Sequence, residues 1–222
     1  MRRILAFLLL APLLASAPTL AFPTPQRDVA RIVSPDFADE NSRDKAGEAT
    51  NVLRILDIHA GQTVADIGAG SGYYTMRVSP VVGPHGWVIA QDIVPAYLQK
   101  LKARTRRAGL RNVRFVQGTP SDPRLPRASV DVALLIHMYH EIAQPYALIY
   151  KLRASLKPDA RVAIVDLDRP SGEHGMPKAL LVCEVKAMGY ALVSIDDLKP
   201  GYLAVFKPAA AVDPATVKGC RA

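Results

Sequence analysis

The sequence predicts a doubly wound α/β domain whose seven-stranded sheet is mostly parallel and carries an antiparallel last strand. Short apolar segments alternate with longer segments of helical periodicity, which places helices on both faces of a parallel sheet. A glycine-rich loop, residues 68–72, follows the first apolar segment. The last two apolar segments are joined only by residues 196–201, a connection too short for a parallel crossover, so they must form a hairpin.

Composition indicates one domain with appendages. The chain has 222 residues, half of them apolar, and a formal net charge of +8, which suits an ordinary globular protein with its own core. The charge is spread along the chain, and we interpret it as a contribution to solubility. The basic stretch at residues 100–114 lacks the interleaved aromatic residues of single-strand binders. We therefore expect a solvated helix face there and no nucleic-acid partner.

Residues 1–21 have the order of an export signal. The basic pair Arg2-Arg3 precedes an apolar segment at residues 4–17, which is shorter than the ~20 residues of a membrane span. Pro18 disfavours an earlier cut, so cleavage is expected after Ala21. We therefore expect an exported protein, periplasmic or secreted, with no stable membrane span after cleavage. The alternative is an uncleaved signal that anchors the chain in the inner membrane.

The first half of the chain predicts alternating helices and strands after a polar extension at residues 22–45. Residues 46–58 place apolar side chains on one side of a helix, and Gly61 ends it. The apolar residues 63–67 then predict the first strand. The elements that follow are a helix at 73–82, a strand at 87–91, a helix at 95–108 and a strand at 113–117.

The second half completes the sheet. The apolar residues 130–136 predict the fourth strand, and residues 190–195 and 202–206 form the closing hairpin. Residues 208–222 are rich in Ala and Pro, and we expect them to be disordered. The remaining elements are a helix at 140–156, a strand at 161–166 and a helix at 179–188.

The sequence contains two cysteines, Cys183 and Cys220. Cys183 lies in an apolar helical pattern and is expected to be buried, whereas Cys220 lies in the tail. An oxidising compartment would allow them to pair, but we expect two free thiols. The spacing of Cys and His residues matches no metal site.

The glycine loop distinguishes between three kinds of ligand site. Its glycines allow a sharp turn and a close approach of a ligand to the main chain. A triphosphate-binding loop would end in Lys followed by Ser or Thr, and a dinucleotide loop would have glycine at position 73. Tyr73 and Tyr74 stand there instead, which disfavours a nicotinamide-dependent oxidoreductase. The pattern present is three alternate glycines, with Asp66 at the end of the preceding strand.

This stretch, VADIGAGSGYY at residues 64–74, resembles motif I of the class I S-adenosylmethionine-dependent methyltransferases. That family has a second acid at the end of the next strand, and WVIAQDIVPAYL supplies Asp92. LLIHMYHEI and KLRASLKPDARVAIVDL resemble the family's fourth-strand exit and fifth strand, although residues 157–160 read Lys-Pro-Asp-Ala where Lys-Pro-Gly-Gly is commoner. The resemblance spans residues 46–207. Within the family, the chain resembles a branch of predicted, exported methyltransferases. It implies a Rossmann-like fold and S-adenosyl-L-methionine as cofactor.

The resemblance also implies roles for residues that contact the cofactor. Asp92 would accept hydrogen bonds from both ribose hydroxyls, or else cap the next helix. The amides of the glycine loop would line the methionine part, and Asp66 would hold the cofactor's ammonium or brace the loop. Tyr73 would pack beside the methionine part or belong to the core. The expected cofactor-binding residues are Asp66, Gly68, Gly70, Gly72, Tyr73, Asp92, Ile93, Thr119, Asp122 and His137.

The adenine end departs from the family pattern. Thr119 stands where an acid is common, so either Thr119 with Ser121 or Asp122 would contact the exocyclic amine. The alternative for Asp122 is a turn residue before Pro123. Ile93 would pack against the adenine face.

His137 and His140 are the candidate catalytic residues because they follow the fourth strand, where the transferred methyl group should lie. Either imidazole suits a base, since it titrates near pH ~6.5; the alternative is that they cap nearby amides. A metal is not expected, because their spacing is not that of zinc peptidases and no third ligand is evident. His174, in the loop after the fifth strand, is a weaker candidate.

Two further expectations concern function. Methyl transfer is largely a matter of aligning the acceptor with an already electrophilic carbon, so a base is needed only for a protonated acceptor. We expect a small-molecule acceptor, and by analogy with the fold we expect the charged cluster near Glu40 and Arg43 to form a lid.

The alternative to a methyltransferase is a non-catalytic cofactor-binding or sensing protein, which export from the cytoplasm would favour. The acceptor and the oligomeric state are not readable from the sequence.

Overall fold

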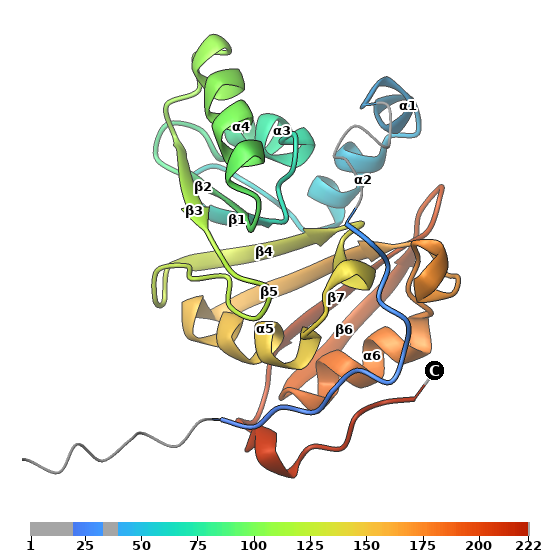
Figure 1. Ribbon diagram of the computed structural model, residues 1–222. Coiled ribbons are helices and arrows are strands. Elements are labelled where there is room, and N and C mark those ends of the chain that lie inside the picture. Colours follow the sequence, from blue (N-terminus) through green and yellow to red (C-terminus); the bar gives the residue numbers. More distant parts are fainter. Residues whose placement is uncertain (1–19, 33–39, 222) are drawn as a thin grey trace, which may run out of the picture.

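The structure, a computed structural model, describes residues 20–32 and 40–221 and is built on one seven-stranded sheet. The strand order is β3-β2-β1-β4-β5-β7-β6 (Figure 1). The strands are β1 (Thr63–Ile67), β2 (Trp87–Asp92), β3 (Val113–Gln117), β4 (Val130–Ile136), β5 (Leu156–Asp166), β6 (Tyr190–Asp197) and β7 (Tyr202–Pro208).

The sheet is parallel from β3 to β5, and β7 is antiparallel to both β5 and β6. The predicted antiparallel last strand is therefore confirmed. The strand order reverses between β1 and β4, which are direct neighbours. In a doubly wound sheet this reversal leaves a crevice at the carboxyl ends of the strands, and the fold thus positions a site there.

Helices cover both faces of the sheet (Figure 1). Alternate residues of β1 point to opposite faces, so Val64 packs with α2 and α3 while Ile67 packs with α5 and α6. Leu101 of α4 packs against Ala90 of β2. The helices are α1 (Glu40–Lys45), α2 (Glu48–Ile55), α3 (Tyr73–Val82), α4 (Pro95–Arg107), α5 (Pro145–Leu152) and α6 (Lys178–Ala187).

The helix expected at residues 140–156 is broken, and this prediction is wrong. The chain forms a 3-10 turn at Tyr139–Glu141, then α5, and β5 already begins at Leu156. Pro145 occupies the first turn of α5, where its missing N–H costs nothing, and it restrains the preceding residue away from helical geometry. The break separates the 3-10 turn from α5. Residues 139–141 therefore stay close to the end of β4, at the edge of the sheet.

The tail, residues 209–221, is ordered, which corrects the expectation of disorder. Cys183 of α6 and Cys220 form a disulfide, so the expectation of two free thiols is wrong. Cys183 is exposed rather than buried, whereas Cys220 is buried and its N–H donates to the Tyr146 hydroxyl at 2.7 Å. Composition pointed to disorder because the tail has little apolar surface of its own. A covalent link to α6 and packing on α5 hold it instead.

Residues 20–32 form an extended strap over the face covered by α5 and α6 (Figure 1). Phe22 meets Tyr150 of α5 edge-on at 5.4 Å, and Gln26 bridges to Arg221 of the tail. The Nε of Arg27 lies 3.0 Å from Oε1 of Glu184 in α6, with side chains only 1% and 0% exposed. The strap therefore joins the core through a buried ion pair.

The expected signal peptide lies almost wholly outside the described residues, which begin at Leu20. Within the ranges described, no helix combines the length and apolar character that a membrane crossing requires.

Arg27→Ala tests the strap. The substitution leaves the carboxylate of Glu184 buried without its partner, and breaking a buried pair typically costs about 3–5 kcal/mol. We expect a fall of that order in the free energy of unfolding, measured by urea denaturation at pH 7. The matched control is Arg31→Ala, which removes an exposed arginine from the same strap. Equal stability of the two variants would contradict the strap's role.

Candidate functional site

A cavity of about 570 Å³ opens at the carboxyl edge of the sheet, around the ends of β1, β2 and β4. Its volume lies within the usual range for small-molecule and cofactor sites. α1, the beginning of α2 and the loop after β5 complete its wall. Of the residues predicted from the sequence, those on the cavity wall are Asp66, Gly68, Gly70, Tyr73, Asp92, Ile93, His137, His140 and the weaker candidate His174.

Asp92 ties the end of β2 to the glycine loop. Its Oδ2 accepts a hydrogen bond from the Gly70 N–H at 2.9 Å, and its Oδ1 accepts one from the Val94 N–H at 2.9 Å. The parallel register places Ile67 beside Gln91, so the loop after β1 and the end of β2 are necessarily adjacent. A carboxylate has about four lone-pair sites, and Asp92 therefore keeps acceptor capacity for a ligand diol.

Glycine is required at two positions of the loop. Gly72 has φ +88°, and a Cβ there would lie 2.0 Å from Cδ1 of Leu101 in α4. Gly68 has φ +69°, and a Cβ there would lie 3.0 Å from the Met138 side chain. Gly72 does not line the cavity; it permits the close packing of α3 against α4. A side chain at either position would therefore collide with its neighbour and distort the loop.

Asp66 braces the first helix after the loop. Its Oδ2 accepts a hydrogen bond from the Thr75 hydroxyl at 2.6 Å, and the residue is buried. Burial raises the pKa of Asp66 to about 6, although the Thr75 hydrogen bonds act in the opposite direction. Of the two roles that the sequence left open, bracing is the one seen here; Asp66 also borders the cavity.

Thr119 and Asp122 are not on the cavity wall. They pair with each other in a turn: the Thr119 N–H donates to the Asp122 carbonyl at 2.8 Å, and the Asp122 carboxylate accepts from the Arg124 N–H at 2.8 Å. Asp122 therefore has the contacts of a turn residue, and its expected contact with the exocyclic amine stays a prediction. Pro120, between them, borders the cavity beside Ile93.

Glu48, which sequence reasoning missed, joins the first turn of α2 to His137. His137 follows β4 with φ +51°, and its Nε2 lies 3.2 Å from Oε2 of Glu48. Arg43 and the hydroxyl of Tyr74 also donate to the Glu48 carboxylate. Burial alone would raise the pKa of Glu48, but the hydrogen bonds from His137 and Arg43 outweigh it and lower this pKa to about 2.

The helix α1 is fastened over the cavity by charge. The Tyr73 ring lies between the guanidinium groups of Arg43 and Arg77, each 3.7 Å from its centroid, and the Tyr73 hydroxyl donates to Asp44 at 2.9 Å. Burial, together with Asp44, raises the pKa of Tyr73 to about 12. Arg104 of α4 holds Glu40 at 2.6 Å. These contacts place the charged cluster where a lid would lie.

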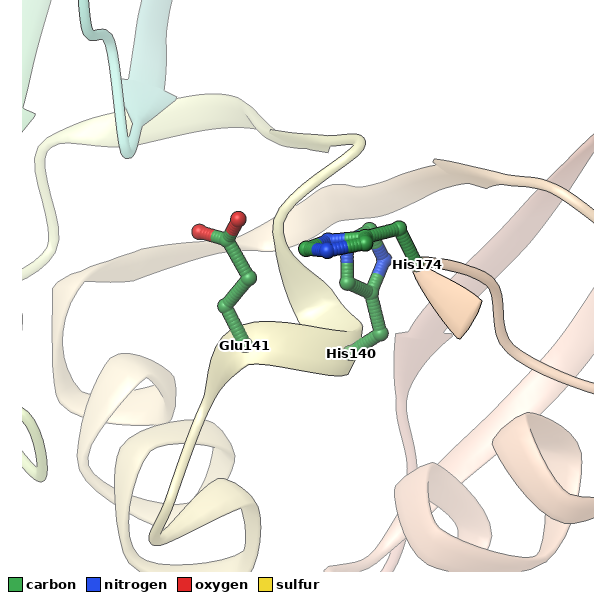
Figure 2. A group of neighbouring side chains, drawn as sticks. All are labelled: His140, Glu141 and His174. Carbon is green, nitrogen blue, oxygen red and sulfur yellow. The ribbon is translucent and has the colours of Figure 1, made fainter. Parts of the chain in front are cut away.

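His140, Glu141 and His174 lie near one another on the cavity wall (Figure 2). The Nδ1 of His140 lies 2.9 and 3.0 Å from the two carboxylate oxygens of Asp166 at the end of β5, and both residues are buried. A carboxylate only accepts, so Nδ1 carries the proton in this pair and the unprotonated nitrogen of a neutral ring is Nε2. The rings of His140 and His174 meet edge-on at 5.5 Å.

The strap fixes the turn that carries His140. Arg27 donates to the carbonyls of Tyr139 and His140 at 3.3 and 3.2 Å, and the Ala30 N–H donates to the His140 carbonyl at 3.1 Å. Sequence reasoning did not identify Asp166, yet it ends a strand at the same sheet edge as Asp66 and Asp92. That shared position at the sheet edge could have identified Asp166 as a site residue from the sequence. Arg27 gave none, because its role depends on tertiary contacts.

Comparison with known proteins gives a consistent pattern. Residues 64–159 match the family model described as "Methyltransferase domain". The chain is 26% identical over 115 residues to the ubiquinone/menaquinone biosynthesis C-methyltransferase UbiE of Coxiella burnetii, covering 51% of this chain and 46% of the relative. The chain thus spans about half the length of the curated relatives it matches.

Solved structures share the fold. A SAM-dependent methyltransferase from Aquifex aeolicus superposes with a TM-score of 0.68 at 22% identity, covering 76% of this chain and 98% of that one. The [4+2]-cyclase SpnF superposes with a TM-score of 0.61 at 15% identity, covering 86% and 88%. These superpositions agree with the fold described above.

The contacts of Glu48 predict an acid-dependent loss of stability. An unfolded chain takes up a proton on Glu48 near pH 4.5, whereas the folded protein does so only near pH 2, so lowering the pH across this interval favours unfolding. A shift of this size is worth on the order of 3 kcal/mol. We expect Glu48→Gln to be less stable at pH 7 and to have a flatter stability profile between pH 4.5 and 2, measured by urea denaturation.

The control is Asp57→Asn, since Asp57 is exposed outside the cavity. Its profile should follow that of the parent chain. A Glu48→Gln profile as steep as the parent's would rule out the described role of Glu48.

Proposed function

We propose that the chain is a class I S-adenosylmethionine-dependent methyltransferase and that it transfers a methyl group to a small-molecule acceptor bound in the cavity at the sheet edge. The match of residues 64–159 to the methyltransferase family model, the curated relatives and the shared fold support this proposal. S-adenosyl-L-methionine is the cofactor of this family. The observation that carries the proposal is the hydrogen bond between Asp92 and Gly70. It brings the two motifs that hold opposite ends of the cofactor into one cavity.

The residues present fit the cofactor. Asp92 has the acceptor capacity for a ribose diol, and Ile93 and Pro120 offer apolar surface beside it for the adenine. Gly68 and Gly70 border the cavity, and we assign the space beside them to the methionine part. When bound, the cofactor supplies an electrophilic sulfonium methyl. The protein's task is then to hold the acceptor in line with that methyl and to exclude water.

The acceptor side is the part of the cavity formed by Ile142, Leu148, Leu167 and the histidine-bearing segments. It is largely apolar with a few convergent polar groups, which is typical of small-molecule sites. His137 is already bound to Glu48 and lies next to the glycine loop, on the cofactor side. His140 is oriented by Asp166 and is the residue that we assign to the acceptor.

Asp92→Ala tests the cofactor assignment. Loss of the carboxylate removes the acceptors for the ribose hydroxyls, and each hydrogen bond to a charged group is worth roughly 1.5–3 kcal/mol. We expect S-adenosylmethionine and S-adenosylhomocysteine to bind at least tenfold more weakly, measured by calorimetry, with NAD as a ligand that should not bind the parent chain. Asp159→Ala, at an exposed acid outside the cavity, should bind like the parent.

Unchanged affinity in Asp92→Ala would refute the ribose assignment. Binding of NAD in preference to the methyl donor would instead favour an oxidoreductase. Turnover of labelled cofactor in a metabolite extract then separates an enzyme from a non-catalytic binding protein, since the latter would bind without transfer. The [4+2]-cyclase with this fold makes that second assay necessary.

We also propose that the chain works outside the reducing cytoplasm. The disulfide between Cys183 and Cys220 supports this location, because disulfides persist in oxidising compartments. The expected signal at residues 1–21 agrees with it. Cleavage after Ala21 would leave Phe22, the residue of the strap that contacts Tyr150, at the start of the mature chain.

Terminal sequencing of the protein from fractionated cells tests the location. We expect a mature N-terminus at Phe22 and both cysteines blocked to alkylation before reduction. A cytoplasmic protein that begins at Met1 with two reactive thiols would contradict the proposal.

A further inference from the structure

We propose that His140, Glu141 and His174 bind a divalent transition-metal ion of the zinc or cobalt class at the acceptor end of the cavity. The metal site rests on the geometry of these three residues, and its part in catalysis rests on the function proposed above. One potential ligand atom from each residue lies within 4.8 Å of the others (Figure 2). Two imidazoles and a carboxylate are a ligand set that zinc commonly takes in catalytic sites.

The fold supplies the third ligand that the sequence did not reveal. His140 and Glu141 are consecutive in the 3-10 turn after β4, whereas His174 lies in the loop after β5. Ligand atoms about 2.0–2.1 Å from a tetrahedral ion lie roughly 3.4 Å apart. Binding therefore requires the half-buried Glu141 and His174 side chains to rotate and bring their ligand atoms closer together.

The surroundings of His140 are those of a metal ligand. Metal-binding histidines usually donate their other ring N–H to a carboxylate, which fixes the tautomer and raises ligand basicity. Asp166 accepts that hydrogen bond at 2.9 Å and is completely buried, so the pair is rigid. Arg27 holds the backbone of the same turn through two carbonyls. Nε2 of His140 is then the nitrogen left for a metal.

The loop that carries His174 is likewise held in place. His174 adopts a left-handed conformation with φ +57°, and Arg169 donates twice to its carbonyl, at 3.3 and 3.2 Å. The Met176 N–H donates to the Leu167 carbonyl at 2.7 Å and closes the base of the loop. A non-glycine residue with positive φ persists where its surroundings enforce it, and such positions are concentrated at functional sites.

Three protein ligands leave at least one coordination position open, as catalytic metal sites do. We assign this position to an oxygen or sulfur atom of the acceptor. Coordination lowers the pKa of its O–H or S–H, and the proton passes to solvent. A lone pair of the resulting anion forms the bond to the methyl carbon while the C–S bond of the sulfonium breaks. Its electron pair stays on sulfur, which gives the methylated acceptor and S-adenosylhomocysteine.

The experiment measures metal binding directly, with the full-length mature chain carrying no histidine tag and stripped by a chelator. Zn²⁺ is titrated by calorimetry, and Co²⁺ by its visible absorption. We expect one equivalent of each to bind, and at least tenfold weaker binding in His174→Ala and in Glu141→Gln. Asp166→Asn should weaken binding about 10- to 100-fold, as loss of a supporting carboxylate typically does.

The matched control is His85→Ala, which removes an exposed histidine outside the cavity and should leave both titrations unchanged. Circular dichroism and thermal melting show whether each variant is folded, and the half-buried Glu141 and His174 keep the test valid if Asp166→Asn unfolds. Absence of one-equivalent binding to the parent chain, or equal affinity in His174→Ala, would overturn the metal site.

The two proposals fail in different ways. A chain that binds S-adenosylmethionine and transfers methyl groups after chelation, with unchanged kcat, lacks the metal step but keeps the proposed function. A chain that binds Zn²⁺ through these residues but never turns over the cofactor keeps the metal site and loses the methyl-transfer proposal.

Discussion

The hydrogen bond from the Gly70 amide to the Asp92 carboxylate is the constraint on which the site depends. It joins the loop after β1 to the end of β2, and the parallel register of these strands makes the contact possible. Gly72 allows α3 to start close to Leu101 of α4, and Asp66 fixes that helix through Thr75. The cofactor half of the cavity is therefore built from neighbouring strand ends on a rigid sheet.

The acceptor half is built differently. His140 and His174 lie on a short turn and a loop. Side chains from distant parts of the chain hold the turn, whereas Arg169 holds the loop locally. Asp166 fixes the His140 ring and Arg27 fixes its backbone. On the opposite wall, Glu48 holds His137, and α1 lies over Tyr73 through two arginines. This division suits the proposed function, because the loops that would meet the acceptor vary more easily than the sheet edge that would hold the cofactor.

Sequence predicted the sheet well because its signals are local. The strands Thr63–Ile67, Val113–Gln117 and Val130–Ile136 have the predicted bounds, since continuous apolar segments between turn residues define buried parallel strands. The cofactor-side residues Asp66 and Asp92 could be placed for the same reason, as each ends a strand.

What sequence could not predict depends on contacts between distant segments. Pro145 is a local signal for a helix start, but the apolar periodicity of residues 140–156 favoured one continuous helix, and the break was therefore not predicted. By contrast, nothing near Cys220 indicates that α6 lies beside it, and nothing near Glu48 indicates His137. The turn in which Thr119 pairs with Asp122 was not predicted either, because a resemblance fixes an approximate position but not the path of a turn. His174 was a candidate in the sequence, but its proximity to His140 and Glu141 is evident only from the structure.

The connection between the two ends of the chain has a consequence for the order of assembly. The disulfide holds the tail on α6, Arg221 of the tail pairs with Gln26, and the neighbouring Arg27 supports His140. During synthesis the glycine loop and Asp92 are complete long before Arg221 emerges. A nascent chain can therefore form the half of the cavity assigned to the cofactor early. The half assigned to the acceptor gains the support of the tail only after Arg221 has been made and the disulfide has formed.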